Sequence, residues 1–82
     1  MNINMTQHGN NGWEFRVTQN GETRQYRTNE QGRGLWELLP RPGAYSDNDT
    51  EYRQIEGTAQ FELPRNRSAA YAKIRRHFVE TV

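Results

Sequence analysis

The chain has 82 residues, a net charge of +1 and 32% hydrophobic residues. This length accommodates one hydrophobic core, so residues 1–82 are predicted to form a single domain. The near-neutral charge implies neither a strongly acidic nucleic-acid mimic nor a uniformly basic nucleic-acid binder. The absence of cysteine excludes disulfides and thiolate metal sites, and it fits a reducing compartment such as the cytoplasm.

Composition also bears on stability and on partners. A core this small leaves only about a few kcal/mol of net stability, which favours help from a homodimer or from a bound partner. The cationic residues are ten arginines and one lysine. Arginine pairs bidentately with carboxylates and phosphates, so this bias suits an interface, although a GC-rich genome explains it equally well. Neither a signal peptide nor a membrane span is expected from the sequence.

Residues 1–10 are polar without periodicity, and they are expected to form a loose arm or a short edge strand. Residues 13–18 alternate apolar and polar side chains and precede Asn-Gly at 20–21, which predicts a β-hairpin with a two-residue turn. Counting outward from this turn predicts the opposed pairs Phe15 with Tyr26, Trp13 with Thr28, Val17 with Arg24, and Glu14 with Arg27.

The middle of the chain is less regular. Residues 35–39 form a short apolar run closed by Pro40, and the flanking glycines favour a strand over a helical turn. Residues 40–50 are rich in turn-forming and polar residues and are predicted to form the longest exposed loop.

The last third of the chain predicts one strand and one helix. Residues 53–63 alternate, with Ile55, Gly57, Ala59, Phe61 and Leu63 on one face, which predicts a half-buried strand bent at the glycine. Asn66 or Ser68 can cap a helix whose apolar face is formed by Ala70, Tyr71, Ile74 and Phe78. The predicted fold is therefore α+β, with a small antiparallel sheet of about four strands and an N-terminal hairpin, packed on one C-terminal helix.

No motif indicates catalysis, a metal or a cofactor. His8 and His77 are far apart in sequence and have no evident Ser or Asp companion, so each is expected to be an ordinary surface residue. The acidic run beginning at Asp47 starts like a calcium loop, but the sixth and twelfth positions hold Tyr52 and Thr58 where an EF-hand needs Gly and Glu. The chain is therefore predicted to be a non-catalytic binding protein.

Two groups of residues are candidates for partner binding. The first joins aromatic and acidic residues around the long loop, and it comprises Trp36, Tyr45, Asp47, Asp49 and Glu51. The two aromatic side chains are interface anchors or, equally, close the far edge of the core. The second is the basic set around the helix, Arg65, Arg67, Lys73, Arg75 and Arg76, which is either a solvated helix face or a surface for phosphates or an acidic protein.

Several stretches of the chain together resemble small proteins encoded by phages and other mobile elements, and among them anti-CRISPR proteins. These stretches are residues 13–17 with the 20–21 turn, 34–36, 57–64 and 69–78. The resemblance implies a stoichiometric inhibitor that occupies a surface of a CRISPR effector subunit, and it assigns no functional residue by position. The net charge departs from the strongly acidic, nucleic-acid-mimicking members of that group. The alternative function is a small nucleic-acid-binding module that uses the basic helix.

Overall fold

The computed structural model describes residues 1–40 and 50–80, which form one antiparallel sheet and one helix. The five strands lie in the order of the sequence, each paired with the next. They are β1 (Asn2–His8), β2 (Gly12–Gln19), β3 (Glu22–Arg27), β4 (Trp36–Pro40) and β5 (Thr50–Gln54), and they are followed by α1 (Arg67–Glu80). The α+β class with one C-terminal helix is confirmed, with one strand more than expected.

The N-terminal hairpin has the predicted register. Phe15 faces Tyr26 and Glu14 faces Arg27 across β2 and β3. The turn residues Asn20 and Gly21 have φ angles of 53° and 81°. Both values are positive, as a two-residue turn that follows the twist of the strands requires.

Residues 1–10 do not form a loose arm. Residues 2–8 pair along their whole length with β2, from Asn2 opposite Thr18 to His8 opposite Gly12. They make β1 an edge strand, the second of the two predicted alternatives. The run at 35–39 is a strand from Trp36 onward, β4, and its pairing with β5 extends the sheet to its other edge.

The predicted strand at 53–63 is wrong beyond residue 54. The Ile55 amide still donates to the Leu35 carbonyl at 2.9 Å, but the chain then turns at Gly57, whose φ is 81°. The buried Thr58 hydroxyl donates to the Ile55 carbonyl at 2.7 Å and accepts from the Leu35 amide at 3.2 Å. These bonds pair the Leu35 amide and the Ile55 carbonyl, which in a continuing strand would pair with backbone groups of a neighbouring strand. Residues 55–66 therefore fold back as a series of turns.

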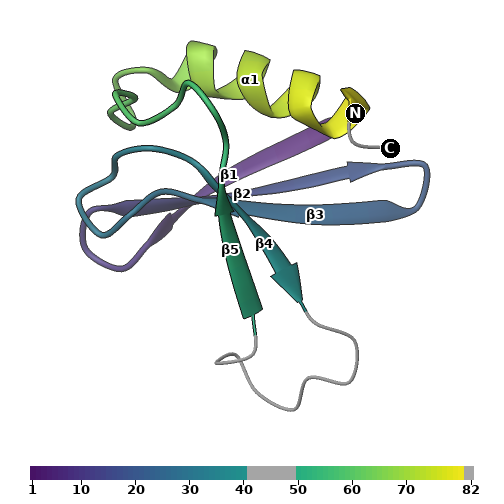
Figure 1. The fold of residues 1–82 in the computed structure, drawn as a ribbon, viewed down its shortest axis with the longest axis horizontal. Coiled ribbons are helices and arrows are strands. Elements are labelled where there is room, and N and C mark those ends of the chain that lie inside the picture. The colour runs from purple at the N-terminus through teal and green to yellow at the C-terminus, as the bar shows by residue number, and fades with distance from the viewer. Residues whose placement is uncertain (41–49, 81–82) are drawn as a thin grey trace.

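The helix packs on one face of the sheet, as Figure 1 shows. Its buried residues are Ala70, Ile74 and Phe78, four residues apart, so they form one stripe along α1. Asn66 precedes the helix as predicted, but its side chain accepts a hydrogen bond from the Glu62 amide at 2.9 Å. The stripe meets a core cluster from the sheet and the loops, which consists of Phe15, Val17, Tyr26, Leu35, Ile55 and Leu63.

Candidate binding face of the sheet

The sheet has an inner face under α1 and an outer face that no element of residues 1–40 or 50–80 covers (Figure 1). Side chains alternate between these faces along each strand. Tyr26 and Glu37 are opposed in the register and both contact α1 through His77, so their neighbours Arg27 and Trp36 lie on the outer face. Tyr52, opposite Leu38, is on that same outer face.

At one end of the outer face is an open groove of about 760 Å³. Its walls are the β1–β2 turn and the segment after β3, and its floor is aromatic. The lining residues are 8–12, 27–31, Trp36 and Tyr52. This volume falls within the range of about 300–1,000 Å³ that is typical of ligand-sized pockets.

Hydrogen bonds of ordinary length hold both walls of the groove. In the β1–β2 turn, the Gln7 side-chain amide donates to the Asn10 carbonyl at 2.8 Å. The Asn29 side chain accepts from the amides of Gln31 and Arg33 at 3.0 and 2.8 Å, which closes the loop after β3 on itself. The Thr28 hydroxyl accepts from the Trp13 amide at 2.9 Å and anchors that loop to β2. A site whose walls are ordered before binding loses less entropy when it binds.

Arg27 supplies the cation of the groove, and its hydrogen bonds are incomplete. The guanidinium donates to the Glu14 carboxylate at 3.4 Å and to the Tyr52 hydroxyl at 3.5 Å, both near the upper limit for a hydrogen bond. Its Nε atom is buried and has no hydrogen-bond partner among the described residues. The terminal nitrogens hold only long bonds in a side chain that is 26% exposed, so they are the atoms suited to a carboxylate or a carbonyl oxygen of a binding partner.

Two aromatic side chains accompany this arginine. Trp36 is half-buried, and its indole rests on Gly34 so closely that a Cβ there would lie 2.8 Å from the ring. Tyr52 is 50% exposed and is one of the few large apolar side chains of the described residues that face solvent. Leu38 lies in β4 opposite Tyr52. It is buried, but it does not belong to the core cluster under the helix. The outer face thus combines Trp, Tyr and Arg, the residue types that dominate binding energy at protein interfaces.

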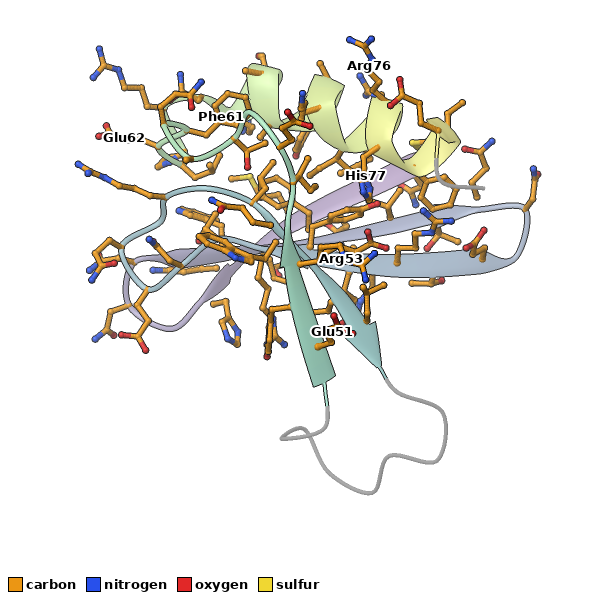
Figure 2. The ribbon with its side chains drawn as sticks, in the orientation of Figure 1. Glu51, Arg53, Phe61, Glu62, Arg76 and His77 are labelled. Atoms are coloured by element: carbon orange, nitrogen blue, oxygen red, sulfur yellow. The ribbon has the colours of Figure 1, made fainter. Side chains whose placement is uncertain are left out.

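Of the aromatic and acidic residues predicted to bind a partner, the structure describes Trp36 and Glu51, which lie on opposite faces of the sheet. Tyr45, Asp47 and Asp49 lie outside the described residues. Glu51 adjoins Tyr52 in β5 and therefore points to the opposite face, where it approaches Arg53 at 3.7 Å (Figure 2). Trp36 is the member of this group that the structure places in the groove.

The basic residues around the helix differ in exposure and in the side of the helix that they occupy. Arg76 is 74% exposed, points away from the sheet in Figure 2 and pairs with Glu80 at 2.9 Å. Lys73 is half-buried, with its ammonium 3.4 Å from where a Cβ of Gly57 would lie. Arg75 is two positions from Lys73, on the other flank of the helix. The exposed Arg65 and Arg67 lie at the N-terminal end of the helix. Lys73 and Arg76, three positions apart, are neighbours on the helix surface, and Arg65 and Arg67 are separate from them at its N-terminal end.

His77 is not the ordinary surface residue that the sequence suggested. Its Nδ1 lies 3.1 Å from the Tyr26 hydroxyl and its Nε2 lies 3.2 Å from the Glu37 carboxylate. No pattern in the sequence indicated this cluster, because its members come from three different elements. Burial, followed by the nearby Glu37 charge, raises the pKa of Tyr26 to about 12. The order carboxylate, imidazole, hydroxyl is that of a hydrolytic triad, but the Tyr26 hydroxyl belongs to a fully buried residue that substrate cannot reach. The cluster links α1 to β3 and β4.

Within residues 1–40 and 50–80, no group of three or more His, Asp or Glu side chains is placed to hold a metal ion. No helix in the described part of the chain has the length and apolar character needed to span a bilayer. Comparison of the chain with protein-family models, with curated proteins and with solved structures gives no match.

Proposed function

We propose that this protein is a non-catalytic binding protein that attaches to another protein through the outer face of its sheet. The observation that carries the proposal is the grouping of Trp36, Tyr52 and Arg27 around a groove with ordered walls. Large rigid rings lose little conformational entropy on binding, and the arginine supplies a directional contact. The chemistry of the groove suits a partner segment that combines an apolar side chain with a carboxylate or free carbonyl oxygen.

A protein partner is favoured over nucleic acid by the distribution of charge. Arg16 and Arg27 are the cations on the strands of the outer face, and Glu14 lies between them in the sheet register. Nucleic-acid binding needs several cations that neutralise successive phosphates. Among the cations of the helix, Lys73 is half-buried near Gly57 and Arg76 is paired with Glu80.

The resemblance to phage-encoded proteins extends this proposal to a specific class of partner. The protein would act in the cytoplasm of a bacterial host as a stoichiometric inhibitor that occupies a subunit of a nucleoprotein defence complex, of the CRISPR effector type. Occupation of a surface needs neither a cofactor nor turnover, which agrees with a binding face built from aromatic and arginine side chains.

The test is a pull-down from a bacterial lysate, with tagged wild type and two double variants. Trp36→Ala/Tyr52→Ala removes both rings, and Arg75→Ala/Arg76→Ala removes two exposed helix cations as a matched control. We expect a stoichiometric protein that persists after nuclease treatment and in moderate salt, is lost with the first variant and is retained by the second. Recovery of nucleic acid alone, or loss of the partner with the helix variant only, would contradict the proposal.

A further inference from the structure

The outer edge of β1 is a second surface available for binding. β1 is the first strand of the sheet and is paired with β2 on one side. An edge strand presents unpaired backbone amide and carbonyl groups along its free side, and these groups can pair with another strand. The edge is separate from the groove, except that His8 contributes to both.

β1 lacks the features by which proteins usually protect a sheet edge. Its seven residues include no proline and no Asp, Glu, Lys or Arg. Its pairing with β2 runs one to one from Asn2 to His8, so no bulge twists it away. The opposite edge differs, because β5 carries Glu51 and Arg53 in a shorter strand. Charges on edge strands disfavour edge-to-edge association, so β1 is the edge open to it.

The occupant that fits this edge best is a second copy of the same strand. An antiparallel pair of identical strands has a two-fold axis, and placing it at Met5, the middle of β1, aligns the full strand. Asn4 of one copy then faces Thr6 of the other. Ile3 and Met5, half-buried against the core, lie on the same face in both copies and extend the apolar layer across the junction. An uncharged strand meets its own copy without repulsion between like charges.

We propose that two copies associate through antiparallel pairing of β1 with β1, which joins their sheets into one continuous sheet. The pairing satisfies the free backbone groups of the edge and covers the exposed sides of Ile3 and Met5. A domain with a small core gains stability from such association. This proposal concerns the edge, and it does not rest on the proposed function of the outer face.

Sedimentation velocity over a dilution series tests the pairing with charged variants. The positions to be changed are 4 and 6. Within one subunit, Asn4 faces Arg16 and Thr6 faces Glu14, so a charge at either position has one neighbour in β2 and another in the second copy. Asn4→Lys/Thr6→Lys and Asn4→Glu/Thr6→Glu each place like charges opposite one another across the two-fold axis. An equal mixture of the two variants places opposite charges there instead. Circular dichroism of each variant confirms that the fold is intact.

We expect the wild type to form dimers that dissociate on dilution. Each charged variant alone should have a dissociation constant raised by about tenfold or more, and the mixture should regain the dimer as a heterodimer. A wild type that stays monomeric at every concentration would overturn the proposal. So would a dimer that the substitutions leave unchanged, or a mixture that fails to associate, because the contact would then lie elsewhere.

Discussion

Ionisation of Tyr26 should make the protein unfold at alkaline pH. The residue is fully buried, and its pKa is raised from about 10 to about 12 by burial and by the Glu37 charge. A raised pKa means that the folded protein favours the neutral phenol. The stabilisation is therefore fully present below pH 10, the pKa in the unfolded chain, and is lost as the pH rises through 12. A difference of about two pH units corresponds to about 3 kcal/mol in the free energy of unfolding.

The assay is urea unfolding of the wild type and of Tyr26→Phe at a series of pH values from neutral to above 12. The phenylalanine variant keeps the ring and has no group to ionise, so it reports all other alkaline effects. We expect the wild type to lose about 3 kcal/mol more than the variant between pH 10 and 12. Parallel curves for the two proteins would refute the reasoning, because they would show that Tyr26 ionises as it does in the unfolded chain.

Three further predictions concern the turn after β5, the contact between Gly34 and the Trp36 indole, and the core. Thr58→Val should cost about 1–3 kcal/mol in the free energy of unfolding, since it leaves buried backbone groups unpaired, whereas Thr58→Ser should cost much less; equal losses would contradict this. Gly34→Ala should destabilise the fold and shift the tryptophan fluorescence more than Gly9→Ala does. Gly9 is the control, because it has a similar positive φ but open space around it. Equal effects of the two substitutions would argue against the contact between Gly34 and the indole. Ile74→Ala should lower the free energy of unfolding by about 2–5 kcal/mol, whereas Val79→Ala, at an exposed position, should change it by no more than about 0.5 kcal/mol. A small loss for Ile74→Ala would contradict the assignment of Ile74 to the core.

The sequence predicts the elements that depend on local chemistry. The Asn-Gly turn sets the register of the first hairpin, because few other residues accept positive φ at both positions. The i, i+4 spacing of Ala70, Ile74 and Phe78 identifies the buried face of the helix. These signals are contained within a few residues, so they need no knowledge of the tertiary fold.

The failed prediction at residues 55–63 has a tertiary cause. The alternation of Ile55, Phe61 and Leu63 looks like a strand, but these side chains reach the core from successive turns. The turns depend on Thr58 bonding to Leu35, a residue 23 positions away, which no periodicity in the sequence reveals.

The candidate site was only partly predictable for the same reason. Trp36 could be singled out because it has no place in the hairpin pattern, and the pairing of Arg27 with Glu14 follows from the turn. The position of Tyr52 beside them depends on the pairing of β4 with β5. That pairing spans residues 41–49, whose composition predicts a loop and gives no register.

The central claim, that a partner protein occupies the outer face, is tested most directly by site-specific photo-crosslinking in bacterial cells. A photoreactive amino acid is placed at Tyr52 on the outer face and, in a separate protein, at the exposed Ala72 on the helix. We predict one protein adduct of defined mass from the first position and none from the second. Adducts from the helix position alone, or crosslinks to nucleic acid, would contradict the account.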